Sequence, residues 1–148
     1  MFFCHLPPFF SERSSSFFAV FIWYNYLDRR KDTGIKMSGM KLYTDMGNWR
    51  AFKCLIAAEY NGIDVEVPNF KMCEDNMTPE FREKSPLGKV PLLETPQGCI
   101  FESNAIARYL SRLRRDTGLY GENVFESAQI DAWVDFCSHE IELPASLW

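Results

Sequence analysis

The chain has 148 residues, of which 47% are hydrophobic and 16% aromatic, so it is long and apolar enough to bury a core. Its formal net charge is −4, and residues 37–148 hold eleven basic against seventeen acidic side chains. This acidic balance argues against direct nucleic-acid binding, which usually needs a basic face.

The five cysteines and two histidines are widely spaced and include no Cys-x-x-Cys pair. This spacing suggests no zinc ligand set, so no metal site is expected. Free thiols in a reducing compartment explain the odd cysteine count, and we expect a cytoplasmic protein.

Residues 1–39 differ in character from the rest of the chain. Residues 17–27 form an apolar and aromatic run, which is shorter than the roughly 20 residues of a membrane span. Acidic and bulky aromatic residues fit neither a secretory signal nor a mitochondrial presequence. We interpret residues 1–39 as an extension that is disordered or precedes the functional start at Met37 or Met40, and we expect no membrane association.

From Met40 the pattern predicts a strand, a helix and a second strand. Residues 41–44 form the first strand, Asn48 caps the helix, and Asn61-Gly62 ends it in a left-handed turn. Alternation over residues 63–67 predicts a strand parallel to the first.

The predicted helix carries large apolar side chains at helical spacing. Trp49 and Phe52 are expected in the core, as are Leu55, Ile56 and Tyr60. Arg50 is expected to hold the preceding loop through a carboxylate such as Asp45.

The next stretch predicts a short helix and a hairpin. Thr78 and Pro79 begin a helix that ends before Pro86. Two apolar runs flank the turn at residues 95–98, which predicts an antiparallel hairpin. Pro91 lies inside the first run, where a trans proline would break the ladder, so a cis Val90–Pro91 bond is predicted.

The hairpin leads into a helix over residues 103–115 with Ser103 as its predicted N-cap. The resulting order of strands and helices predicts a thioredoxin-like α/β domain over residues 40–117. Residues 118–148 begin a second, helical unit, whose first helix runs until Pro144. Its apolar face has no predicted partner within the chain, so we interpret this unit as truncated. That face comprises Ala128, Ala132, Trp133, Phe136 and Cys137.

Several strings in this sequence carry a family resemblance. In order, they resemble the glutathione-transferase-like N-terminal domain found in gamma subunits of translation elongation factor 1. The strings are residues 48–53, 56–58, 78–81, 88–91 and 101–107. The resemblance covers about residues 40–148 and implies the glutathione transferase fold, an N-terminal thioredoxin-like domain followed by an all-helical C-terminal domain.

The resemblance also implies a site for glutathione. Val90 would offer its backbone N–H and C=O to the cysteinyl part, held out by cis-Pro91. Glu102 would meet the γ-glutamyl ammonium and Ser103 its carboxylate, at a helix N-terminus, while Lys89 would approach the glycyl carboxylate. The alternative stays open that the fold needs cis-Pro91 and the helix-start serine whether or not a ligand binds.

Catalysis by a glutathione transferase needs a hydrogen-bond donor near the end of the first strand, because the thiolate of glutathione is the attacking species. Only Thr44 and Asn48 are candidates there, and Asn48 is already explained as an N-cap. Tyr43 is expected to be a packed aromatic residue. The family's catalytic signal is therefore weak in this chain.

The resemblance, together with the weak catalytic signal and the truncated helical unit, leaves three functions as alternatives. The first is a non-catalytic scaffold that anchors the beta-type guanine-nucleotide exchange subunits of elongation factor 1. The second is a cytosolic glutathione transferase that conjugates glutathione to electrophiles, and the third is a truncated product without independent function. No cofactor is expected to be required, the resemblance implies glutathione as the candidate ligand or substrate, and both homo- and hetero-oligomers stay open.

Overall fold

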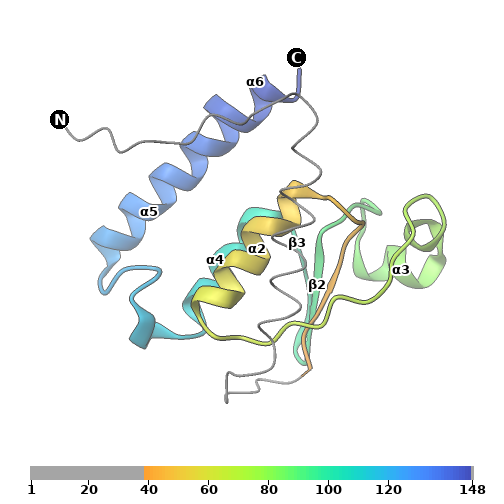
Figure 1. Ribbon diagram of the computed structural model, residues 1–148, viewed down its shortest axis with the longest axis horizontal. Coiled ribbons are helices and arrows are strands. Elements are labelled where there is room, and N and C mark those ends of the chain that lie inside the picture. The colour runs from red at the N-terminus through yellow and green to blue at the C-terminus, as the bar shows by residue number, and fades with distance from the viewer. Residues whose placement is uncertain (1–38, 148) are drawn as a thin grey trace, which may run out of the picture. The chain divides into compact units, whose positions relative to one another are not determined.

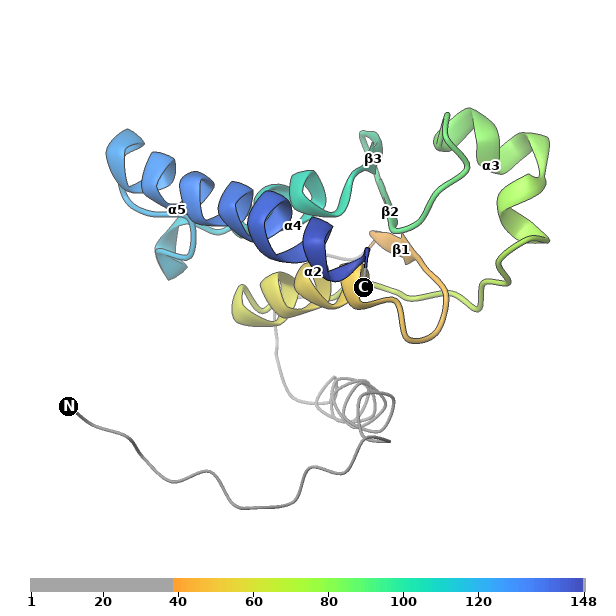
Figure 2. The ribbon, with the colours of Figure 1, turned by 90° about the horizontal axis from the view of Figure 1, so that it is seen from above.

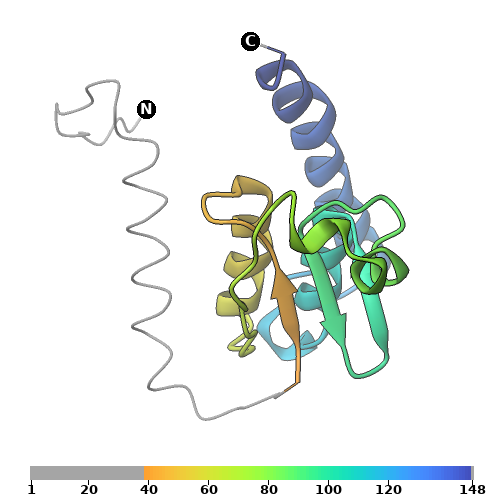
Figure 3. The same ribbon diagram turned by 90° about the vertical axis from the view of Figure 1, so that its right-hand side faces the viewer.

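The computed structural model describes residues 39–147, so all but the last residue of the predicted extension over residues 1–39 lies outside the described part. Three antiparallel strands form the sheet in the order β1-β2-β3, with bounds β1 Lys41–Tyr43, β2 Leu92–Thr95 and β3 Gly98–Phe101 (Figure 3). Leu42 pairs with Leu93, and Thr95 pairs with Gly98 across the turn. The predicted hairpin is confirmed.

The predicted strand at residues 63–67 is reduced to a single parallel bridge between Lys41 and Glu66. Two main-chain hydrogen bonds flank it, from Leu42 to Glu66 and from Glu66 to Met40. The predicted alternation holds, because Ile63 and Val65 are buried while Glu66 is exposed. The strand prediction was therefore right in direction and too long, since only one residue pairs with β1.

Helices α2 (Trp49–Tyr60) and α4 (Ser103–Arg112) lie side by side on one face of the sheet, and α3 (Pro79–Lys84) lies on the other face (Figures 1 and 3). Their N-caps follow the sequence in two cases: Asn48 accepts from the N–H of Arg50, and Thr78 accepts from that of Phe81. Short turns η1 (Asp75–Met77) and η2 (Arg115–Thr117) join the elements. Between the sheet and its helices lies the core, with fully buried Leu42, Val65, Leu92, Leu93, Ile106 and Leu110.

The face of α2 that packs inward differs from the predicted one. Trp49 is 48% exposed and Tyr60 is 73% exposed, whereas the small residues Ala51, Cys54 and Ala58 are buried. Small side chains let the axes of α2 and α4 approach closely, so they take the inner face and leave the large aromatics outside. Of the predicted core residues Leu55 is buried, Phe52 is half-buried and Ile56 is exposed.

After α4, which ends at Arg112 rather than at residue 115, the chain forms one long helical rod (Figure 2). It consists of α5 (Val124–Phe136), the π-helical turn η3 (Cys137–Glu142) and α6 (Leu143–Ala145). Every member of the predicted apolar face is exposed, and Trp133 is 68% exposed. Polar contacts attach the rod to α4 instead, with Arg108 bonded to Asp131 and Asp135. No helix within residues 39–147 is long and apolar enough to cross a membrane.

Candidate functional site

A pocket of about 180 Å³ lies where the loop before β2 meets the starts of α2 and α4 and the turn η3. All five residues predicted to bind a glutathione-type ligand line this pocket: Lys89, Val90, Pro91, Glu102 and Ser103. The structure thus brings together residues from two separate segments, and the ligand they bind stays a prediction.

The loop at Val90 presents its main chain to the pocket. The Val90–Pro91 bond is cis, as predicted. Ser85 Oγ donates to the Lys89 carbonyl at 3.1 Å, and Asn76 Nδ2 donates to the Gly88 carbonyl at 3.0 Å. Neither the N–H nor the carbonyl of Val90 has a hydrogen-bond partner within residues 39–147. The hydrogen bonds to Gly88 and Lys89 hold this loop in place, and the N–H and carbonyl of Val90 are available to a ligand.

Glu102 adopts a backbone conformation that is rare outside glycine, with φ 69° and ψ 117°. Such a conformation costs on the order of 1–3 kcal/mol and occurs most often at ligand sites and switches. The positive φ turns the chain out of β3 so that the helix already starts at the next residue. Ser103 is therefore the first residue of α4, and the prediction that it is the N-cap is wrong by one position.

The start of α4 offers several free donors. The first helical hydrogen bond runs from the N–H of Ile106 to the Glu102 carbonyl, so the N–H groups before Ile106 point out of the helix end. The side chains of Lys89, Glu102 and Ser103 form no hydrogen bond or ion pair within the described part of the chain. An ammonium beside Glu102 and an anion at the helix end fit this arrangement.

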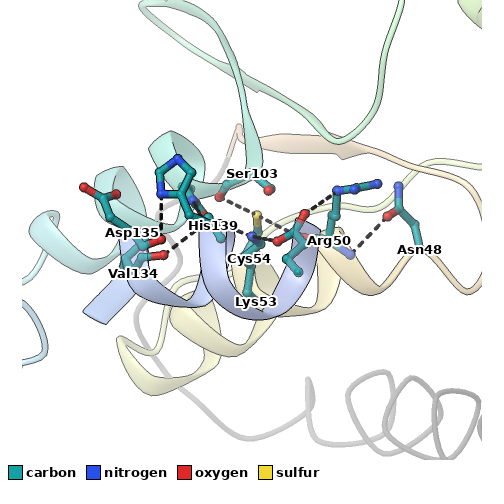
Figure 4. A network of polar contacts seen from close by, with 11 residues as sticks. Asn48, Arg50, Lys53, Cys54, Ser103, Val134, Asp135 and His139 are labelled. Atoms are coloured by element: carbon teal, nitrogen blue, oxygen red, sulfur yellow. Dashed lines mark hydrogen bonds and ion pairs between the residues drawn. The ribbon is translucent and has the colours of Figure 1, made fainter. Parts of the chain in front are cut away.

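The opposite side of the pocket is a network of bonded charges (Figure 4). Arg50 Nε lies 2.7 Å from Glu142 Oε1, and Lys53 Nζ lies 3.3 Å from Glu142 Oε2. Lys53 also donates to Asn104 Oδ1 at 2.6 Å, and Asn104 donates to Ser138 Oγ at 2.6 Å. The network therefore ties α2 to α4 and to η3.

The expected link between Arg50 and Asp45 is wrong. The Arg50 side chain turns toward η3 and bonds Glu142, while its guanidinium lies 4.4 Å from the centre of the Trp49 ring. Asp45 instead accepts a hydrogen bond from Asn48 Nδ2 at 3.1 Å. Asp45 and Asn48 therefore hold the loop before α2, and Arg50 is left to face the pocket.

The two candidate thiol activators are occupied elsewhere. Thr44 is 4% exposed and its hydroxyl donates to the Asp45 carbonyl at 3.3 Å, while Asn48 caps α2. Neither residue lines the pocket. Tyr43 packs edge-on against Phe70 and Phe81, as expected for a packed aromatic residue.

Beneath the pocket, Cys54 is fully buried and its Sγ lies 3.3 Å from the Ser103 carbonyl. Burial raises the pKa of the Cys54 thiol to about 12, so the thiol stays protonated at neutral pH. Cys54 is thus a packing residue.

A second cluster of titratable groups lies away from the pocket, beside α3. Glu94 accepts hydrogen bonds from Lys84 Nζ at 2.6 Å and from Tyr43 OH at 2.8 Å. These two bonds, that from Lys84 first, lower the pKa of the Glu94 carboxyl. Within residues 39–147, no group of three or more His, Cys, Asp or Glu side chains is arranged to hold a metal ion.

The sequence did not reveal the charged half of the pocket. Arg50 and Lys53 lie in residues 48–53, one of the segments on which the family resemblance rests, but nothing in that segment indicates that they bond Glu142. Glu142 lies 89 residues beyond Lys53, in a stretch read only for its apolar face. The spacing of Ser138 and Glu142 at i and i+4 was the one available signal, because it places both side chains on one side of a helix.

Comparison with known families and proteins gives a consistent result. The glutathione S-transferase N-terminal domain matches residues 38–112. Elongation factor 1-gamma 1 of Oryza sativa is 51% identical over 108 residues, which cover 72% of this chain and 26% of that protein. Elongation factor 1-gamma of Homo sapiens is 47% identical over 117 residues, which cover 76% of this chain and 26% of that protein. The chain spans about a quarter of the length of these relatives.

Solved structures agree on the fold. A theta-class glutathione S-transferase from Xanthomonas axonopodis pv. citri, with glutathione bound, matches with a TM-score of 0.62 and 29% identity, over 70% of this chain and 50% of that one. Glutathione transferase F2 from Populus trichocarpa matches with a TM-score of 0.63 and 27% identity, and the match covers 68% of this chain and 49% of that one. The predicted thioredoxin-like α/β fold is confirmed. The chain belongs to the glutathione S-transferase N-terminal domain family, and it shares about half of its aligned residues with proteins named elongation factor 1-gamma.

Proposed function

We propose that this chain serves translation elongation as a non-catalytic scaffold, whose glutathione-transferase-like domain anchors the beta-type guanine-nucleotide exchange subunits of elongation factor 1. The observation that carries the proposal is the level of identity. It is 51% to an elongation factor 1-gamma over 108 residues, against 29% and 27% to the two transferases compared above.

The geometry of the pocket supports a non-catalytic role. Thr44 and Asn48 hold the chain near the start of α2 and do not line the pocket. Arg50 does line it, but its Nε–H is already donated to Glu142. A glutathione transferase holds the thiolate with a donor near the end of the first strand, and the two candidates for that position, Thr44 and Asn48, lie outside the pocket.

Affinity capture tests the scaffold proposal. The full tagged chain is incubated with cell extract, and retained proteins are identified by mass spectrometry. We expect the exchange subunits of elongation factor 1 among them, and their absence with a chain that is folded by circular dichroism would overturn the proposal.

The pocket favours a second proposal, that this chain binds a glutathione-type ligand without turning it over. It is supported by the free main chain of Val90, the free carboxylate of Glu102 and the free hydroxyl of Ser103 on the walls of one pocket. Calorimetry with glutathione tests it. Ser103→Ala should weaken binding, and the matched variant Ser146→Ala, at the exposed residue that follows α6, should not. An absence of heat at millimolar glutathione would contradict the proposal.

A further inference from the structure

The pocket already holds a carboxylate, and that carboxylate belongs to the chain itself. Each oxygen of Glu142 meets a different cation, with Oε1 at 2.7 Å from Arg50 Nε and Oε2 at 3.3 Å from Lys53 Nζ. The Glu142 side chain is 19% exposed, compared with 44% for Arg50. A pair of cations in which each contacts a different oxygen of one carboxylate can bind the carboxylate of a ligand in the same way.

The two cations are held in place by neighbours that do not depend on Glu142. Lys53 Nζ donates to Asn104 Oδ1 at 2.6 Å, and Asn104 is held in turn by Ser138. Arg50 stacks over the Trp49 ring at 4.4 Å. Because these contacts fix both head groups, removal of Glu142 would leave the cations oriented toward the same point.

Glu142 reaches the cations from an unusual helical turn. It ends η3, a π-helical turn in which the N–H of Leu143 bonds the Ser138 carbonyl, five residues back. Pro144 comes two residues after Glu142 and has no N–H to donate to the fourth carbonyl back, which favours this wider turn. π-Helical turns are rare and are frequent at functional sites. The turn directs Ser138 and Glu142 together into the pocket.

We propose that Arg50 and Lys53 form, together with Ser103, the carboxylate subsite of the pocket, and that Glu142 fills its cationic side until the α-carboxylate of a γ-glutamyl ligand displaces it. This inference depends on the second proposal above, that the pocket binds a glutathione-type ligand. The subsite adjoins Ser103 through Asn104, so it lies beside the end of the pocket where Glu102 would receive the γ-glutamyl ammonium. Glu142 therefore competes with the ligand carboxylate for Arg50 and Lys53, and so lowers the affinity of the pocket for such ligands.

Removal of the competitor should strengthen ligand binding. Glu142→Gln keeps the size of the side chain and removes its charge, so glutathione should bind about two- to fivefold more tightly, the range expected for a partly exposed charge pair. Glu140→Gln removes the same charge two residues away, at an exposed position, and should leave the affinity unchanged. Adding Arg50→Gln to Glu142→Gln should abolish the gain, since it removes half of the cationic side of the subsite.

The choice of ligand identifies which carboxylate enters. 4-Aminobutyryl-cysteinyl-glycine keeps the ammonium, thiol and glycyl carboxylate of glutathione and lacks only the γ-glutamyl α-carboxylate. Glu142→Gln should tighten glutathione and leave this analogue unaffected. An equal gain for both peptides, or equal affinity of the wild type and Glu142→Gln for glutathione, would overturn the subsite.

A second readout separates failure of the subsite from failure of the ligand. In Glu142→Gln, succinate should shift the NMR signal of the Arg50 Nε–H, and in the wild type it should not at the same concentration. If glutathione binds neither form but succinate moves this signal, the subsite stands and the glutathione proposal fails. If glutathione binds both forms equally and the Arg50 signal stays fixed, the ligand proposal stands and the subsite fails. If neither probe has any effect, both are overturned.

Discussion

The side-chain amide of Asn61 donates a hydrogen bond of 2.6 Å to the carbonyl of Leu110 and so joins the end of α2 to the end of α4. It also donates to Ser111 at 3.0 Å and accepts from Thr117 Oγ1 at 2.6 Å. Asn61 is fully buried, and one side chain thus satisfies carbonyls that the last turn of α4 leaves free.

Substitution of Asn61 by alanine should lower the free energy of unfolding by about 1–3 kcal/mol, because it leaves buried polar groups without partners. Urea unfolding monitored by circular dichroism measures the loss. Asn69→Ala, at an exposed loop position, should change stability by less than about 0.5 kcal/mol. A loss at Asn61 no larger than that of this control would contradict the role assigned to the side chain.

The backbone conformation of Glu102 should lower the stability of the fold, while its carboxylate contributes to glutathione binding. Its φ of 69° suits glycine, so Glu102→Gly should be more stable than Glu102→Ala by roughly 1 kcal/mol, although both remove the carboxylate. Thermal unfolding of the two variants measures this difference. Both should lose glutathione binding by calorimetry to the same extent. Equal stability of the pair would show that the conformation carries no strain.

The thiols should differ in reactivity. Burial raises the pKa of Cys54 to about 12 and removes it from solvent, whereas Cys73 and Cys137 are exposed. In the native protein at pH 7.5, maleimide should label Cys73 and Cys137 within minutes and leave Cys54 unlabelled until the chain unfolds. Peptide mapping by mass spectrometry reads out each site. Rapid native labelling of Cys54 would mean that α2 and α4 separate readily.

Stability should depend on pH through Glu94. Its pKa is lowered in the folded state by the hydrogen bonds from Lys84 and Tyr43, so the unfolded state binds more protons in acid. The resulting stabilisation is present above the unfolded pKa of about 4.5 and is lost as the pH falls through the lower folded value. It should stay below about 1 kcal/mol, because the side chains of Glu94 and Lys84 are 33% and 39% exposed.

Comparison with Glu94→Gln isolates this effect. The difference in unfolding free energy between the wild type and Glu94→Gln should shrink between pH 6 and pH 3. A difference that is constant over this interval would indicate that Glu94 is not stabilised in its charged form.

The parts of the fold set by local chemistry were predictable from the sequence. The N-caps Asn48 and Thr78, the turn at residues 95–98 and the cis bond before Pro91 all follow from what these residues do to their own backbone. The five ligand residues could be named because the resemblance places them, and the structure gathers them in one pocket.

Features that depend on distant packing were not predictable. The helix α2 has two apolar arcs at helical spacing, and only the tertiary packing decides that Ala51, Cys54 and Ala58 face inward while Trp49 stays exposed. The positive φ of Glu102 makes Glu102 rather than Ser103 the N-cap of α4, and the preference of serine for N-cap positions does not predict this shift. Glu142 meets Arg50 across 92 residues of sequence, and the spacing of Ser138 and Glu142 shows only that both lie on one side of a helix, not which residue they contact.

The proposed scaffold role requires that this chain binds an exchange subunit of elongation factor 1 and does not catalyse glutathione transfer. A titration of the purified beta-type exchange subunit of elongation factor 1 into the full chain, followed by calorimetry, tests this claim most directly. We predict saturable binding, together with a rate of glutathione conjugation to 1-chloro-2,4-dinitrobenzene no higher than the uncatalysed rate. A folded chain that gives no heat with the exchange subunit and accelerates the conjugation would contradict the scaffold role.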